Sequence, residues 1–356
     1  MTTKVGSGST PKGGNAVYTS AGHCFVRSQN VGMGYLILDE IAHINDVIHQ
    51  KHKATELKED DVLLNITGAS IGRTAIATKE IEGGNVNQHV CIIRANSKVN
   101  PKFLCNYIQT KKIQNYIQSL QTGGSREGLN FEQIRSFPIS LPNIAEQNKI
   151  AQLLDKLNER IATQNKIIDK LKSLIKGIRN DVYGKLRKSV GFNAMISDVL
   201  SYEQPQPYIV ENTEYTAEGT PVLTANKAFV LGYTSETNGI YDKGDCIIFD
   251  DFTLDCKYVD FPYKIKSSAI KILTAKNKEI LRYTFEFLKY LDLSTDEHKR
   301  HYIAETQNQE FILPTMHIVS TIAHAFSALS LQMESVVKQR NMFEKQKQYL
   351  LRKMFI

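Results

Sequence analysis

The stretch that decides the fold is residues 150–182, IAQLLDKLNERIATQNKIIDKLKSLIKGIRNDV. Apolar residues recur there in alternating steps of four and three, interrupted only by Gln164: Ile150, Leu154, Leu157, Ile161, Ile168, Leu171, Ile175, Ile178 and Val182. This heptad pattern predicts a helix about 50 Å long, with Asn143 as its N-cap after Pro142. Because its apolar stripe is narrow, the helix needs a second helix to cover it.

The end of the chain supplies that second helix. Its apolar positions each lie 172 residues after a position of the first: Ile322, Phe326, Leu329, Met333, Val336, Phe343, Leu350 and Met354. The Leu-Pro pair at 141–142 recurs at 313–314 with the same offset. Arg340 and Lys347 replace two apolar positions, which is consistent with a polar end that faces a partner. The shared entry and spacing predict an internal duplication.

Each predicted helix follows a block of short strands. Strands are expected at 60–67, 87–94, 244–250 and 267–273, and shorter helices at 101–118 and 278–291. The expected fold is mixed α+β, with two globular domains separated by a pair of long antiparallel coiled-coil helices in a pseudo-two-fold repeat. The expected division is 1–143, 144–188, 189–314 and 315–356. Such helices would act as a ruler between two recognition modules, which suits duplex DNA with two half-sites.

Composition places the chain among ordinary globular proteins. It has 356 residues, 42% hydrophobic and 23% charged, which suits two or three domains. No apolar run of about 18 residues and no secretory signal occur, so neither a membrane span nor secretion is expected. Five cysteines, an odd number without a CxxC pair, indicate reduced thiols in the cytoplasm.

The positive charge lies on the long helices. The formal net charge is +7, but residues 144–188 carry +6 and residues 334–353 carry +4, which leaves −3 elsewhere. Two interpretations stay open: the helices have solvated basic faces, or they neutralise phosphates or an acidic partner protein.

Catalytic and metal motifs are absent from the sequence. No Asn-Pro-Pro-aromatic or Asp-Pro-Pro-Tyr methyltransferase motif, GxSxG motif or HExxH motif occurs. Gly68–Arg73 lacks the Gly-Lys-Ser/Thr ending of a phosphate-binding loop and is interpreted as a tight turn. Phe249–Phe252 contains two aspartates without histidine or cysteine ligands nearby, so a turn is favoured over a metal site. No metal and no catalysis are expected.

The sequence resembles the DNA-specificity (S) subunits of type I restriction–modification systems. In the first half the resemblance is carried by Gly8–Lys12, Gly68–Gly72, Asn85–His89 and Phe131–Leu186, especially FPISLPNIAEQNKIAQLLD at 137–155. In the second half it is carried by Tyr215, Thr220–Ala225, Leu231–Thr234, Phe249–Thr253 and Lys264–Ala269. The chain departs from the family in having no Trp and only seven residues before Gly8. The first domain is therefore expected to be shortened or to lack its opening strand.

The resemblance implies a non-catalytic DNA-binding protein of phage defence. It implies two target recognition domains that each read one half of a bipartite site in double-stranded DNA. The long helices would bind methylation subunits, two of them, and through these the restriction subunits. S-adenosylmethionine, ATP and Mg would belong to those partners, with no cofactor in this chain. A coiled-coil adaptor with two protein-binding domains and no DNA readout is the alternative.

The candidate site residues come from polar loops next to the predicted strands. In the first block the candidate DNA-binding residues are Ser9, Thr10, Lys12, Arg27, Thr67, Ser70, Arg73, Gln88, His89, Ser125 and Arg126. In the second block they are Thr224, Asn226, Lys227, Asp250, Asp251, Thr253, Lys257, Lys264, Lys266 and Ser267. The residues expected to pack the helix pair are Ile150, Leu154, Leu157, Ile161, Ile168, Leu171, Ile322, Phe326, Leu329, Met333, Val336 and Phe343. For Ser125–Arg126 a flexible connector and a DNA contact stay equally open, as do a solvated face and a phosphate contact for Lys264–Ser268.

Overall fold

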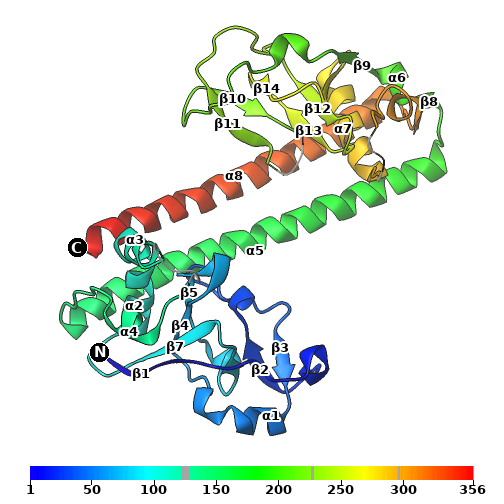
Figure 1. Ribbon diagram of the computed structural model, residues 1–356. Coiled ribbons are helices and arrows are strands. Elements are labelled where there is room, and N and C mark those ends of the chain that lie inside the picture. The colour runs from blue at the N-terminus through cyan, green and yellow to red at the C-terminus, as the bar shows by residue number, and fades with distance from the viewer. Residues whose placement is uncertain (122–127, 226–227, 296, 298, 356) are drawn as a thin grey trace. The chain divides into compact units, whose positions relative to one another are not determined.

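A computed structural model describes residues 1–121, 128–225, 228–295, 297 and 299–355. The chain forms two compact units, and the mixed α+β class predicted from the sequence is confirmed (Figure 1). Unit 1 comprises residues 1–165 and 338–356, and unit 2 comprises residues 166–337. In the part of the chain that is described, no helix is both long enough and apolar enough to span a membrane.

Unit 1 contains two small sheets. The first is antiparallel, and its strands in order of pairing are β1 (Thr2–Ser7), β7 (Val90–Ala95), β4 (Val62–Asn65) and β5 (Thr74–Ile76). The second sheet has the order β3 (Ala42–Ile44), β2 (His23–Val26) and β6 (Asn85–Val86). Its middle strand, β2, is antiparallel to β3 and parallel to β6. The helices between and after these strands are α1 (Asp46–Lys51), α2 (Pro101–Ile108), α3 (Lys111–Ser119) and α4 (Phe131–Arg135).

Unit 2 repeats this topology. Given in the same direction as for unit 1, the strands of its antiparallel sheet are β9 (Leu200–Glu203), β15 (Ile270–Ala275), β12 (Cys246–Asp250) and β13 (Cys256–Val259). Its second sheet again pairs one strand antiparallel and one parallel to the middle strand: β11 (Val230–Thr234), β10 (Thr220–Leu223) and β14 (Lys264–Ile265). The remaining elements are β8 (Ala194–Met195), α6 (Ile196–Val199), α7 (Lys278–Leu291) and β16 (Glu310–Phe311). The same strand order in both units confirms the predicted repeat.

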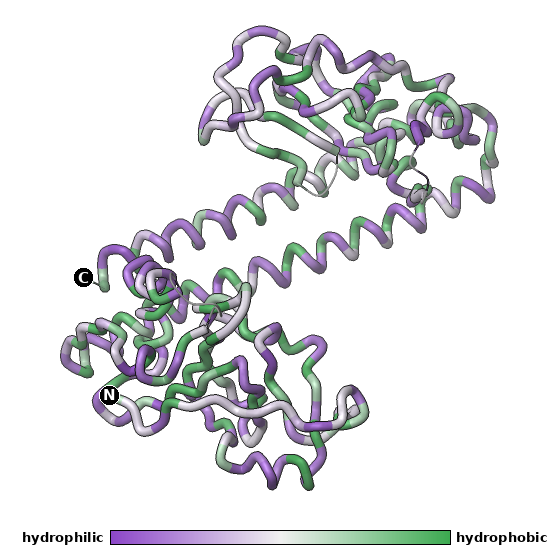
Figure 2. The backbone as a smooth tube through the Cα atoms, in the orientation of Figure 1, coloured by the Kyte–Doolittle hydropathy of each residue, from purple (hydrophilic) through white to green (hydrophobic). Residues whose placement is uncertain are grey.

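Two long helices, α5 (Ile144–Ser189) and α8 (Met316–Met354), contribute residues to both units. Hydrophilic and hydrophobic residues alternate along both of them (Figure 2). Asn143 caps α5 as predicted, since its Oδ1 accepts a hydrogen bond from the Glu146 amide at 2.9 Å.

Within each unit the two helices run antiparallel. In unit 1 the Gln164 side-chain amide donates to Gln339 at 3.3 Å, and the Arg160 guanidinium lies 5.5 Å from the centre of the Phe343 ring. Residue numbers therefore fall along α5 as they rise along α8. In unit 2 Arg179 lies 5.9 Å from the centre of the Phe326 ring. Of the residues expected to pack the helix pair, six are buried: Ile150, Leu154, Leu157, Ile168, Leu171 and Phe326. The others are half-buried: Ile161, Ile322, Leu329, Met333, Val336 and Phe343.

Three expectations are wrong. The helix expected at 101–118 is two helices, because the Thr110 hydroxyl accepts from the Ile113 amide and starts α3 as its N-cap. Of the two alternatives for the first domain, the missing opening strand is wrong, since β1 pairs along β7. Lys347 does not face a partner: it is buried in unit 1, where its Nζ donates to Gln109 Oε1 at 2.9 Å.

Candidate nucleic-acid interface

In unit 1 the structure brings three of the predicted reader loops together. The Gly8 amide donates to the Asn87 carbonyl at 3.2 Å, and the Ile66 amide donates to the His89 carbonyl at 3.0 Å. A Cβ atom at Gly8 would lie 1.7 Å from the Val86 carbonyl oxygen, so only glycine permits this approach. The loop of Gln88 is therefore held between the loops of Thr10 and Thr67.

The side chains of these loops form one hydrogen-bonded chain, which we call the polar tetrad: Thr10, Gln88, His89 and Thr67. The Thr10 hydroxyl donates to Gln88 Oε1. Gln88 Nε2 lies 3.1 Å from His89 Nε2, and His89 Nδ1 lies 2.6 Å from Thr67 Oγ1. Thr10 and Gln88 are exposed, whereas Thr67 and His89 are half-buried.

The other candidates of the first block lie in different settings. Lys12 and Arg73 are exposed, and the exposed Ser9 lies with its hydroxyl 3.0 Å from His52 Nδ1. Ser70 accepts a hydrogen bond from Asn65 at 3.1 Å, and Arg27 is half-buried, 5.7 Å from the centre of the Tyr18 ring. Ser125 and Arg126 fall outside the described residues.

In unit 2 the two candidate aspartates hold the backbone. Asp250 Oδ1 accepts from the amides of Phe252 at 2.9 Å and Thr253 at 3.0 Å. Asp251 Oδ1 accepts from the amides of His301 at 3.0 Å and Tyr302 at 2.7 Å. Both aspartates are buried, so neither is exposed to a base.

The candidate lysines of unit 2 differ in exposure. Lys264 is buried; its Nζ lies 2.5 Å from a Glu236 carboxylate oxygen and donates to the Asn238 carbonyl at 2.9 Å. The expected alternation of exposed basic and hydroxyl groups along 264–268 is therefore wrong at Lys264. Lys266 is exposed, and Lys257 is half-buried, 3.8 Å from Asp255. Among the hydroxyl candidates, Thr253 and Ser267 are exposed and Thr224 is buried. Asn226 and Lys227 are not among the described residues.

Sequence reasoning missed Arg300. Its guanidinium donates to the carbonyl and hydroxyl of Ser268, at 3.1 and 3.3 Å, and lies 5.6 Å from the centre of the Phe252 ring. The Arg300 side chain is 49% exposed beside the exposed Lys266–Ser267 stretch, and its guanidinium lies 3.7 Å from the buried Asp251 carboxylate. The only sequence signal was the basic pair Lys299–Arg300, which lies about 30 residues away from that stretch.

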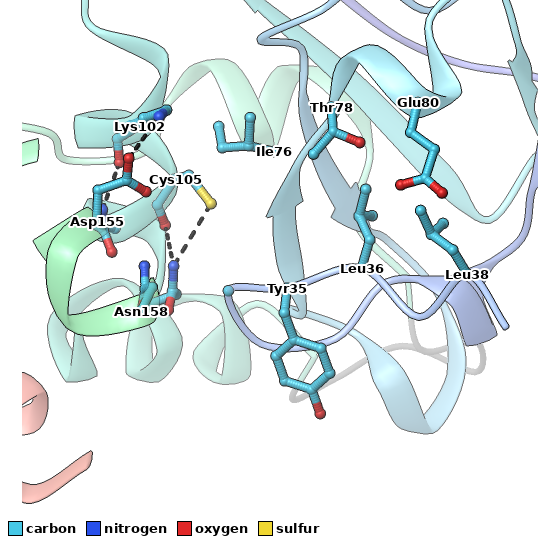
Figure 3. A pocket seen from close by; sticks show the side chains of 13 residues that line it. Tyr35, Leu36, Leu38, Ile76, Thr78, Glu80, Lys102, Cys105, Asp155 and Asn158 are labelled. Atoms are coloured by element: carbon cyan, nitrogen blue, oxygen red, sulfur yellow. Dashed lines mark hydrogen bonds and ion pairs between the residues drawn. The ribbon is translucent and has the colours of Figure 1, made fainter. Parts of the chain in front are cut away.

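Unit 1 also contains a pocket, which differs from the polar loops in having a partly apolar lining (Figure 3). Its volume is about 350 Å³, and apolar side chains such as Leu36 and Ile76 face Lys102 and Asp155 across it. Lys102 and Asp155 pair with each other at 2.6 Å, so this charge pair is internally balanced. None of the candidate DNA-binding residues lines the pocket.

Metal and thiol chemistry find little support among the described residues. Glu297, His301 and Glu305 could together offer three ligand atoms, but the Lys299 ammonium pairs with both carboxylates, at 2.5 and 2.9 Å. Burial raises the pKa of Cys91 to about 12 and that of Cys105 to about 11, which keeps both thiols protonated and poorly nucleophilic.

Comparison with known proteins finds a family match in the first half of the chain. Residues 12–173 match the family model for the type I restriction modification DNA specificity domain. This segment contains three members of the polar tetrad: Thr67, Gln88 and His89.

Particular relatives agree with this match. The chain is 37% identical over 168 residues to the type I restriction enzyme EcoR124I/EcoR124II specificity subunit of Escherichia coli. This match covers 43% of this chain and 42% of the relative. It is 26% identical over 139 residues to the EcoBI specificity subunit of the same organism, covering 37% and 28% of the two chains. The matches thus span less than half the length of these curated relatives.

A solved structure shares the fold over almost the whole chain. The type I restriction–modification S subunit from M. genitalium matches with a TM-score of 0.64, 14% identity and coverage of 99% of this chain and 93% of that one. At this identity the likeness shows the fold alone, and it includes unit 2, which lies largely beyond the family match.

Proposed function

We propose that the chain is the DNA-specificity subunit of a type I restriction–modification complex and binds double-stranded DNA sequence-specifically. The observation that carries this proposal is the family match over residues 12–173, a segment in which polar loops meet at the exposed Gln88. Base readout requires polar side chains that are fixed in place yet exposed, and Gln88 fulfils both conditions.

In this proposal each unit reads one half of a bipartite target. Unit 1 would read with the polar tetrad and contact phosphates through Lys12 and Arg73. Unit 2 would use Lys266, Ser267, Thr253 and Arg300, because these side chains are exposed, whereas Asp250, Asp251 and Lys264 hold the fold. The repeated sheet topology supports two equivalent readers.

The remaining parts of the proposal concern partners and chemistry. The chain itself would perform no catalysis and hold no cofactor or metal. Two methylation subunits would bring S-adenosylmethionine, and restriction subunits that join through them would use ATP and Mg. The complex would act in the cytoplasm. A coiled-coil adaptor without DNA readout is not favoured, because the matched family model describes a DNA specificity domain.

Selection from a random duplex library tests the proposal. The full chain is incubated with the library at two salt concentrations, and bound duplexes are sequenced. We expect a defined motif to be enriched and binding to weaken steeply with salt, since phosphate contacts release counterions. An adaptor would enrich no sequence, and that result would contradict the proposed function.

A further inference from the structure

The backbone that carries Gln88 is fixed on both sides. The Asn87 amide donates to the Val26 carbonyl at 3.1 Å, and the Asn87 side chain accepts from the His89 amide at 3.1 Å. Asn87 is buried, whereas Gln88 is exposed. The fold therefore presents one exposed amide side chain from a rigid loop.

The polar tetrad fixes the orientation of that amide. Gln88 Nε2 can only donate, so the His89 Nε2 atom accepts, and the ring proton lies on Nδ1. Nδ1 then donates to Thr67 Oγ1 at 2.6 Å, while the Thr10 hydroxyl donates to Gln88 Oε1. Thr10 and His89 act as positioning residues, because they hold the amide oxygen on one side and the amide nitrogen on the other.

The amide keeps one donor and one acceptor for a ligand. A carboxamide oxygen accepts two hydrogen bonds and its NH₂ group donates two. Among the described residues, Thr10 uses one acceptor position and His89 uses one donor position. The second N–H and the second oxygen lone pair therefore remain for a base.

From this geometry we infer that Gln88 reads an adenine in the major groove of the half-site bound by unit 1. Adenine presents the N7 acceptor next to the N6 amino donor. The amide N–H of Gln88 can donate to N7 while its amide oxygen accepts from the N6 amino group. Guanine presents two acceptors, cytosine one donor, and thymine one acceptor beside a methyl group, so none of them satisfies both amide atoms in that groove. The inference rests on the proposed function.

The test combines side-chain and base substitutions. Random-library selection is repeated with the full chain carrying Gln88→Ala, and with Gln118→Ala, an exposed glutamine of α3 outside the reader loops, as control. We expect wild type and the control to select adenine at one position of one half-site. Gln88→Ala should lose that preference by about 5- to 150-fold and keep the rest of the motif.

Replacing the selected adenine by 7-deazaadenine removes only the N7 acceptor. This duplex should bind wild type more weakly than the unmodified one, whereas Gln88→Ala should bind both equally. Thr10→Val should weaken the adenine preference while the melting temperature stays the same. An unchanged motif with Gln88→Ala, or an equal deaza effect in both proteins, overturns the inference and leaves the proposed function standing. A wild-type chain that enriches no sequence overturns both.

Discussion

Lys347 is a charged side chain held inside unit 1. Its ammonium donates to Gln109 Oε1, and a Cβ at Gly34 would lie 3.0 Å from its Nζ. Burial lowers the pKa of Lys347, because desolvation disfavours the charged form. The residue thus exchanges hydration for one hydrogen bond to a neutral amide, which makes the stability of unit 1 sensitive to pH.

The sign of that sensitivity follows from linkage. A lysine whose pKa is lower in the folded chain than in the unfolded chain binds fewer protons when folded, so stability rises with pH between the two values. We expect the free energy of unfolding of wild type, minus that of Lys347→Met, to increase as pH approaches 10.5. Urea unfolding of both proteins between pH 7 and 10 measures it. A difference that is independent of pH would contradict the burial of the charge.

Residue identity alone predicted some of these settings and not others. The polar loops of unit 1 were predicted as a group because glycines and polar residues follow strands, and the structure joins Thr10, Gln88 and Thr67 through hydrogen bonds. The inward positions of Asp251 and Lys264 were not predictable, because the partners named above lie 26 to 51 residues away along the chain. A polar side chain does not reveal from sequence whether it serves the fold or a ligand.

At the scale of elements, α7 ties the two long helices together within unit 2. Glu286 of α7 is buried and pairs with Arg179 of α5 at 2.6 Å and with Arg282 at 2.8 Å. Arg282 also donates to the Phe326 carbonyl of α8 at 3.1 Å. One carboxylate thus balances two guanidinium groups at the meeting point of three helices.

Removing that carboxylate should be costly. Glu286→Ala leaves two largely buried cations without their anion, so we expect the free energy of unfolding to fall by about 3–5 kcal/mol. Asp155→Ala is the control, since its pair with Lys102 is partly exposed and should cost at most about 1 kcal/mol. Chemical unfolding of the three proteins measures both losses, and equal losses would refute the role of α7.

Elements were predicted where periodicity or composition was strong. The heptad spacing identified α5 and α8, and the apolar runs located β4, β7, β12 and β15. The break between α2 and α3 was missed because Thr110 leaves no gap in the apolar pattern. The strand β1 was missed because TTKVGS contains a single large apolar residue. Its pairing with β7, which no local signal encodes, makes it a strand.

At the scale of the whole molecule, the repeat gives two units with the same sheet topology and different polar surfaces. Unit 1 offers the polar tetrad around Gln88 with the exposed Lys12 and Arg73, whereas unit 2 offers Lys266 and Arg300. If each unit reads its own half-site, substitutions in one unit should not alter the bases selected by the other.

Arg300→Ala tests this independence. Because an arginine that contacts phosphate adds affinity without base information, the variant should bind all duplexes more weakly and lower the salt slope by about 1. The adenine preference assigned to Gln88 should stay. Lys276→Ala, an exposed lysine of unit 2 outside the reader loops, is the control and should match wild type. Competition binding at several salt concentrations measures the slopes, and a changed base preference with Arg300→Ala would contradict independent reading.

The most direct measurement is a hydroxyl-radical footprint of the full chain on the duplex that it enriches. Two equivalent readers predict two protected segments separated by a spacer of fixed length, with protection lost at high salt. A single continuous protected segment, or no protection at all, would contradict the account of this chain as a two-module DNA-specificity protein.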